Sequence, residues 1–99
     1  MIDRKFHSKK PLEKITTDIT YLDYGPKKLY LSSIMDVFNG EILSYTISEK
    51  QDIACVLDTL NQLKNIPENC ILHSDQGSIY TSYAYYEVTK AKNIIRSMS

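Results

Sequence analysis

The sequence has 99 residues, the size of one small domain, and 42% of them are hydrophobic, which excludes a disordered or fibrous chain. Its 12 basic and 12 acidic residues give no net charge at pH 7, and this argues against a nucleic-acid-binding module that works alone. The 2 cysteines lack metal-ligand spacing, and no apolar run suits a signal peptide or a membrane span, so we expect a reduced, cytoplasmic protein with no membrane partner.

The first half of the chain has the pattern of a β-meander. Residues 1–13 are polar and basic, and we interpret them as an N-terminal arm leading into a domain over residues 14–99. From Lys14, apolar and polar side chains alternate through "KITTDITYLDY", which predicts a strand. A second strand over "LYLSSIMDVFN" runs into Asn39 and Gly40, a strong hairpin signal, and "EILSYTI" follows as the antiparallel partner.

The second half alternates between helix and strand. Between Asp52 and Lys64 the hydrophobic period is that of a helix, and Asp52 is suited to cap its first turn. "CILHSD" is predicted to be a short fourth strand, residues 82–92 a second helix capped by Thr81 or Ser82, and "NIIRSMS" a fifth strand. The predicted order of elements is β-β-β-α-β-α-β.

Two aspartates can meet in such a fold. Asp18 lies in the middle of the first strand, where an ionised carboxylate among apolar neighbours costs several kcal/mol unless it is paired or bound to metal. Asp75 follows the fourth strand, at the carboxyl end where open α/β sheets place ligands. If the fourth strand lies parallel to the first, the two carboxylates face each other, and Mg²⁺ would relieve their repulsion. The alternative is that Asp18 sits at a solvent-exposed edge and Asp75 only begins a loop.

Three strings in a fixed order carry a family resemblance: "TDITYL", then "YLSSIMDVFNGEILSY", then "ILHSDQGSIYTS" followed by "IIRSMS". Together they closely resemble the integrase-like catalytic core of bacterial insertion-sequence transposases, over nearly the whole chain. The resemblance implies a ribonuclease-H-like α/β fold, with a five-stranded mixed sheet in the order 3-2-1-4-5 and flanking helices. In that order the first and fourth strands are neighbours, as a meeting of the two carboxylates requires.

The resemblance also implies an Asp-Asp-Glu triad that holds two Mg²⁺ or Mn²⁺ ions. By motif, Asp18 and Asp75 are the two aspartates, both catalytic and metal-binding. The family's glutamate lies on a helix beyond the fifth strand, which these 99 residues do not include, and Glu87 is predicted to lie before that strand. We therefore expect a partial core, truncated before this helix, inactive alone and of doubtful metal occupancy. Ile15, where many relatives have tryptophan, is a milder departure that should affect packing.

Further residues near the carboxylates are candidates for contacts with substrate or for support of the aspartates. His73 shares a strand face with Asp75, and it either contacts Asp75 or substrate phosphate or forms a structural hydrogen bond. Gly77, after Gln76, either lets the backbone approach DNA or metal or is an ordinary turn glycine. Asp36 is assigned a structural or supporting role. Four tyrosines at helical spacing are expected to cover a core edge with their hydroxyls in water: Tyr80, Tyr83, Tyr85 and Tyr86.

For the intact enzyme, the resemblance implies phosphodiester hydrolysis and DNA strand transfer in a homo-oligomer, with insertion-sequence ends and target DNA as partners. The alternative is a non-catalytic remnant that only associates with itself or with a full-length transposase. A hydrolytic nuclease of the same fold is a third interpretation, which the strings "TDIT" and "HSDQG" disfavour.

Overall fold

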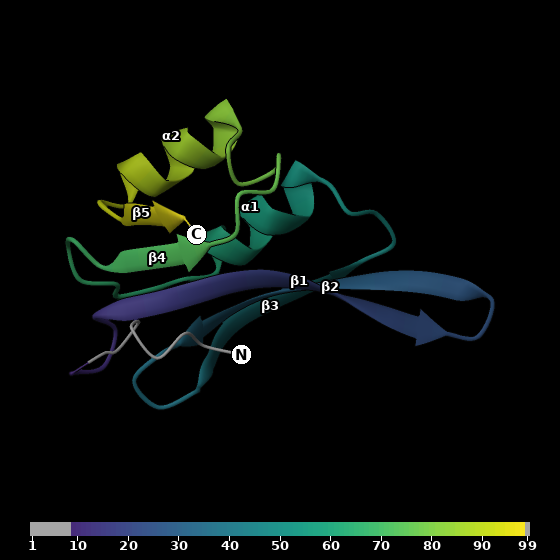
Figure 1. Cartoon of the computed structure of the whole chain (residues 1–99), viewed down its shortest axis with the longest axis horizontal. Helices are drawn as coiled ribbons and strands as arrows, with labels where there is room; N and C mark the ends of the chain where they lie inside the picture. Colours follow the sequence, from purple (N-terminus) through teal and green to yellow (C-terminus); the bar gives the residue numbers. More distant parts are fainter. Residues whose placement is uncertain (1–8, 99) are drawn as a thin grey trace.

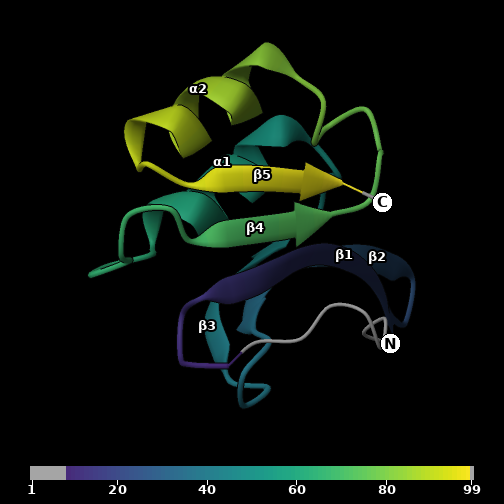
Figure 2. The ribbon, with the colours of Figure 1, turned by 60° about the vertical axis from the view of Figure 1, so that its left-hand side comes forward.

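The computed structural model describes residues 9–98, except for the side chain of Tyr24. Over this range the chain forms one mixed sheet of 5 strands, with two helices packed against one of its faces (Figures 1 and 2). The strands lie in the order β3-β2-β1-β4-β5. The predicted α/β fold, its sheet order and its sequence of elements are therefore confirmed.

Three antiparallel strands form the N-terminal meander: β1 (Lys14–Tyr24), β2 (Lys27–Asp36) and β3 (Ile42–Ser48). Their many β-branched and aromatic residues favour an extended backbone. The loop from β2 to β3 contains Asn39 and Gly40, and Gly40 has a φ of 74°, which only glycine adopts without steric cost. The hairpin predicted at this dipeptide is confirmed.

Each helix begins at a capping side chain. α1 (Ile53–Asn61) starts after Asp52, whose carboxylate accepts a hydrogen bond from a backbone N–H of the first turn at 3.1 Å. α2 (Tyr83–Ala91) starts after Ser82, whose hydroxyl does the same at 3.3 Å. Both caps agree with the predicted ones. In residues 9–98, neither helix is long and apolar enough to cross a membrane.

Parallel pairing builds the second half of the sheet. β4 (Ile71–Ser74) pairs with β1, and β5 (Ile95–Met98) pairs with β4. Only Lys14–Thr16 of β1 is in register with β4, so the longer β1 continues past the end of its neighbour together with β2 (Figure 1). The carboxyl end of β4 therefore opens beside the middle of β1.

The core fills the space between the sheet and the two helices. Ile15 and Ile34 from the sheet meet Leu60 of α1, and all three are fully buried. Burying a side chain of this size contributes about 1.5–3 kcal/mol. A buried polar contact lies beside them, where the Thr59 hydroxyl donates to the Ser32 hydroxyl at 2.9 Å. Ile15 thus packs fully into the core at the position where tryptophan is common in the family.

The opposite face of the sheet carries large side chains with much of their surface in solvent. Strand alternation and register place these side chains on the side away from α1 and α2. Within the described part of the chain, no helix covers this face. Four large residues on it are about half exposed: Ile42, Tyr45, Ile47 and Ile95.

Residues 9–13 are the part of the predicted arm that falls inside the described range, and residues 1–8 lie outside it. These residues turn against the sheet before β1 begins. The Leu12 N–H donates to the Asp36 carboxylate at 3.1 Å, and the Glu13 carbonyl accepts from the Ile71 N–H at 3.0 Å. The segment just before β1 is thus tied to both β2 and β4.

Candidate active site

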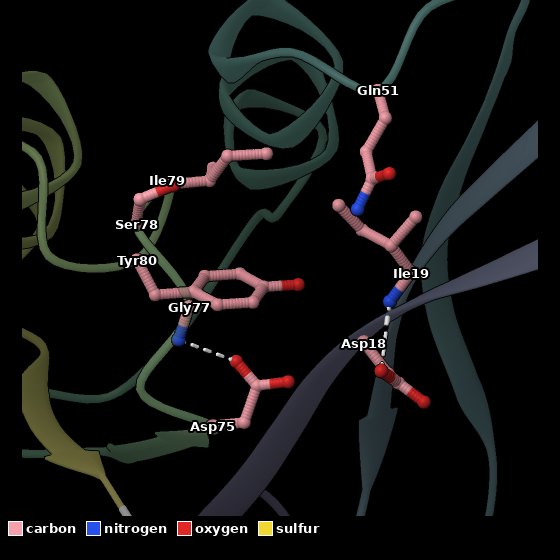
Figure 3. Close-up of a pocket in the computed structure, with 8 residues that line it drawn as sticks. All are labelled: Asp18, Ile19, Gln51, Asp75, Gly77, Ser78, Ile79 and Tyr80. Carbon is pink, nitrogen blue, oxygen red and sulfur yellow. Dashed lines mark hydrogen bonds between the residues drawn. The ribbon is translucent and has the colours of Figure 1, made fainter.

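The two predicted aspartates line one pocket at the carboxyl end of β4 (Figure 3). β1 carries Asp18, and the loop after β4 carries Asp75. The parallel register pairs Thr16 of β1 with His73 of β4. Two residues further along each segment, Asp18 therefore lies level with Asp75. The structure therefore brings together two carboxylates that are far apart in the sequence.

The pocket has a volume of about 210 Å³, with the carboxylates on one side and mostly apolar groups on the other. Gln51, from the loop before α1, extends toward Ile19 on the apolar side (Figure 3). Since a water molecule takes up about 30 Å³ in the liquid, this space admits a hydrated cation or a few ligand atoms. The lining residues besides the two aspartates are Ile19, Gln51, Gly77, Ser78, Ile79 and Tyr80.

Both carboxylates are exposed, and a backbone N–H orients each of them. Oδ1 of Asp18 accepts from the Ile19 N–H at 2.9 Å, and Oδ1 of Asp75 accepts from the Gly77 N–H at 2.8 Å (Figure 3). Among residues 9–98, neither carboxylate has an ion pair, and each Oδ2 lacks a hydrogen-bond partner. The expectation that apolar neighbours desolvate Asp18 is wrong, because β1 here continues past the end of β4 and is open to water.

This pair of side chains fits a small divalent cation. Carboxylate oxygens are the hard ligands that Mg²⁺ prefers, and Mg²⁺ held by one or two carboxylates keeps several water molecules. The negative charges on β1 and on the loop after β4 also repel each other, and a cation between them relieves that repulsion. In the described part of the chain, no group of three or more His, Cys, Asp or Glu side chains converges on one point. The site as described thus supplies two ligands, Asp18 and Asp75.

Gly77 leaves room for the Asp75 carboxylate. A Cβ at position 77 would lie 3.0 Å from Oδ1 of Asp75 and 3.8 Å from Cδ2 of Tyr80. Gly77 does not have the positive φ seen at Gly25 and Gly40. Glycine is therefore favoured here by close approach to a side chain and not by backbone conformation.

The other predicted candidates do not line the pocket. His73 is half-buried, and its Nδ1 lies 3.2 Å from Oγ of Ser97, so it links β4 to β5. Gln76 is exposed in the loop after Asp75. Asp36 is buried at the far end of β2, where its carboxylate accepts two backbone hydrogen bonds at 3.0 and 3.1 Å. These contacts favour the structural interpretations of His73 and Asp36.

Tyr80 is a pocket residue that the sequence pattern did not identify. The expectation of hydroxyls in water is wrong for Tyr80 and Tyr85, which are 4% and 0% exposed and whose hydroxyl oxygens are buried without a hydrogen-bond partner. Tyr83 and Tyr86 are exposed, as expected. Helical spacing does not apply to Tyr80, because residues 77–82 form turns and α2 begins only at Tyr83. Within α2, Tyr85 lies on the buried face, whereas Tyr83 and Tyr86 lie on the exposed one.

Burial raises the pKa of the Tyr80 hydroxyl far above its usual value, and the charges of Asp18 and Asp75 raise it further. Among residues 9–98, neither the Tyr80 hydroxyl nor the nearby Thr17 hydroxyl has a hydrogen-bond partner. Burial also raises the pKa of Tyr85 to about 12. Both phenols are therefore neutral at physiological pH.

The integrase core domain family matches residues 8–99, almost the whole chain. The chain belongs to the integrase core domain family. InsK for insertion sequence element IS150, from Escherichia coli (strain K12), is 38% identical over 102 residues, which cover 100% of this chain and 36% of InsK. The transposase for insertion sequence element IS629, from Shigella sonnei, is 32% identical over 98 residues, or 97% of this chain and 33% of that protein. This core domain thus spans about a third of these relatives' length, and the predicted resemblance is confirmed.

Solved structures of retroviral integrases share the fold of this core domain. The HTLV-2 integrase catalytic core domain in complex with magnesium, in its trimeric form, superposes with a TM-score of 0.82 at 21% identity, covering 94% of this chain and 63% of that one. A chain of the simian T-cell lymphotropic virus intasome gives a TM-score of 0.74 at 22% identity, covering 90% of this chain and 32% of that one. These likenesses confirm the ribonuclease-H-like fold.

Proposed function

We propose that this integrase core domain is the catalytic part of a DNA transposase. In the intact enzyme it hydrolyses DNA phosphodiesters and transfers DNA strands, acting on insertion-sequence ends and target DNA as a homo-oligomer. The observation that carries the proposal is the shared pocket, in which Asp18 and Asp75 each have an oxygen without a partner among residues 9–98. Membership of the integrase core domain family, and similarity to a transposase, support the same activity.

Asp18 and Asp75 are the residues that would hold Mg²⁺ or Mn²⁺, with two ions in the intact enzyme. Such ions, when bound, stabilise the charge that develops on phosphodiester oxygens. The chain's own part is to present the ligands: the N–H groups of Ile19 and Gly77 orient the two carboxylates, and the side chain of Ile79 limits water on the apolar side of the pocket. The HTLV-2 core was solved with magnesium, which supports this choice of cofactor.

The 99 residues alone are proposed to bind a divalent cation weakly and to be inactive. With Asp18 and Asp75 as its protein ligands, the ion keeps most of its water, and its affinity falls to the weak end of carboxylate sites, about 1 mM. Neither the ion nor a DNA phosphate is then fixed in the orientation that phosphoryl transfer requires. A 99-residue polypeptide that nicks DNA with Mn²⁺, at a rate lost in Asp75→Asn, would contradict the inactivity.

A titration with Mg²⁺, followed by amide NMR, tests the site in the 99-residue chain. In the wild type, saturable shifts should centre on Ile19 and Gly77, because their N–H groups contact the two ligands. Asp18→Asn should lose this response. Identical titrations of the two proteins would remove the basis of the proposal. In a longer protein containing this core, Asp75→Asn should abolish strand transfer between oligonucleotide substrates.

The second candidate function is association without catalysis, with another copy of this fold or with a full-length transposase. The observation that favours it is the exposed sheet face, where Ile42, Tyr45, Ile47 and Ile95 are about half exposed. Three of these residues lie on the edge strand β3, and Ile95 lies on β5 at the opposite edge of the same sheet face. Exposed apolar side chains that gather on one strand are typical of interaction surfaces. Sedimentation velocity of the 99-residue chain, alone and mixed with a full-length transposase, should then show complexes that Ile47→Lys weakens. A monomer in both samples would exclude this function.

A further inference from the structure

Tyr80 connects the two elements that carry the carboxylates. On one side its N–H donates to the Gly77 carbonyl at 3.0 Å, which closes the turn after Asp75, and its ring lies against Gly77. On the other side its hydroxyl points toward β1 at Asp18 and Ile19 (Figure 3). The ring therefore occupies the space between the loop of one aspartate and the strand of the other.

The ring of Tyr80 is also held from behind by the core. It is 4% exposed and meets the ring of Tyr85 edge-on, with centroids 5.4 Å apart and planes at 73°. Edge-to-face aromatic pairs prefer this geometry, and Tyr85 itself is fully buried between α2 and the sheet. Because both rings are packed in the core, Tyr80 cannot tilt without disturbing its neighbours.

We infer that Tyr80 is a positioning residue whose ring sets the separation of Asp18 and Asp75 and so makes their site prefer Mg²⁺ over Ca²⁺. The inference rests on the proposed function, since it takes the two-carboxylate cation site as given. Mg²⁺ requires a near-ideal octahedron with oxygens at about 2.0–2.1 Å, whereas Ca²⁺ accepts irregular sites at about 2.3–2.6 Å. A rigid spacer between the ligands therefore favours Mg²⁺, and its loss favours the more tolerant ion.

The ring, and not the hydroxyl, is the part that carries this role. The hydroxyl is buried without a hydrogen-bond partner, so it donates to neither carboxylate. Tyr80→Phe keeps the spacer and removes only the hydroxyl, whereas Tyr80→Leu shortens the spacer. Ile94→Ala is the control, because it removes a buried core side chain, 6% exposed, that neither lines the pocket nor supplies the ring contact holding Tyr80.

Amide NMR titrations of the 99-residue chain with Mg²⁺ and with Ca²⁺ give the ratio of the two dissociation constants for each variant. A general loss of stability leaves this ratio unchanged, since both ions bind the same folded protein. Tyr80→Leu should weaken Mg²⁺ binding by about tenfold, the lower end of what losing a supporting residue costs a metal site, while Ca²⁺ binding stays unchanged, so the preference for Mg²⁺ should fall by about tenfold. Tyr80→Phe and Ile94→Ala should keep the wild-type ratio.

Each other result counts against the inference. It is overturned if folded Tyr80→Leu keeps the wild-type ratio, or if Ile94→Ala or Tyr80→Phe lowers the ratio as much. If the Tyr80→Leu variant gives the NMR spectrum of an unfolded chain, Tyr80→Met replaces it, with the same expected change in the ratio of dissociation constants. Asp18→Asn distinguishes a failure of the cation site from a failure of the role of Tyr80. If it loses both ions while Tyr80→Leu keeps the ratio, only the role of Tyr80 fails. If Asp18→Asn binds both ions like the wild type, the cation site fails and the role of Tyr80 with it.

Discussion

Replacing Gly77 by alanine should weaken cation binding while leaving the folding stability nearly unchanged. The new Cβ would lie 3.0 Å from Oδ1 of Asp75, and this exposed carboxylate can rotate away. Rotation breaks the 2.8 Å hydrogen bond from the Gly77 N–H, at a cost of about 0.5–1.5 kcal/mol. Alanine also lowers the conformational entropy of the unfolded chain, which stabilises the fold by about 0.4–1 kcal/mol. The net change in the free energy of unfolding should stay within about 1 kcal/mol.

The rotated Asp75 carboxylate no longer lies level with Asp18, so the affinity for Mg²⁺ should fall by about tenfold. With a dissociation constant of about 1 mM, adding about 10 mM Mg²⁺ raises the free energy of unfolding of the wild type by about 1.4 kcal/mol, and that of the variant by about 0.4 kcal/mol. For a domain of this size, about 4–8 °C corresponds to 1 kcal/mol. The Tm should therefore rise by about 6–11 °C in the wild type and by about 2–3 °C in Gly77→Ala.

Thermal unfolding followed by circular dichroism, with and without Mg²⁺, measures both quantities in one experiment. Gly40→Ala is the control, because Gly40 has a φ of 74° and no atom within 4 Å of an added Cβ. It should lose about 1–2 kcal/mol through backbone strain and keep the full Mg²⁺-dependent rise in Tm. If Mg²⁺ raises the Tm of Gly77→Ala as much as that of the wild type, the reasoning is refuted, since the Asp75 carboxylate would then not need its present position to bind the ion.

Two further predictions concern buried groups outside the pocket. Asp36→Ala should lower the free energy of unfolding by about 3 kcal/mol, because the lost carboxylate accepts charge-assisted hydrogen bonds from the N–H groups of Leu12 and Phe38. Urea unfolding measures this change, and a loss below about 1 kcal/mol would contradict the prediction. Burial, with a smaller contribution from Asp36, raises the pKa of Cys70 from 9.0 to about 11. Between these values the unfolded chain releases a proton that the folded chain keeps, so the free energy of unfolding should fall as the pH rises, by at most about 1.4 kcal/mol per unit for this thiol. Cys70→Ala should make that fall shallower in urea titrations at high pH, and an unchanged slope would exclude the thiol as its source.

The sheet was predictable because local signals indicate its hairpins and its crossover, and the resemblance implies its strand order. Asn39 and Gly40 define the β2–β3 hairpin, and the change to a helical period after Asp52 marks a crossover to a parallel strand. The resemblance then supplied the adjacency of β1 and β4. Once these strands are neighbours, the positions of Asp18 and Asp75 within them are enough to bring both residues to one pocket.

The environments of the individual side chains were harder to predict. Asp18 lies between Thr17 and Ile19 in a strand that also carries Ile15 and Tyr21, but its exposure depends on where β4 ends, and strand ends are set by tertiary pairing. Tyr80 belongs to a turn closed by a hydrogen bond to Gly77, and its burial follows from the direction of that turn. Gln51 lines the pocket from a loop that carries no motif. Such contacts depend on distances between elements, which periodicity does not encode.

Loop-closure entropy predicts that β1 pairs with its two neighbours at different stages of folding. β2 follows it directly and pairs through a short turn, whereas β4 arrives only after β3 and α1, so closing the β1–β4 pair carries a larger loop entropy. Asp18 is therefore in place on a finished hairpin before Asp75 reaches it. By the same reasoning, a partial opening that detaches β4 would separate the two carboxylates while the meander stays paired. A cation bound between them would hold β4 against β1 and slow amide exchange in β4.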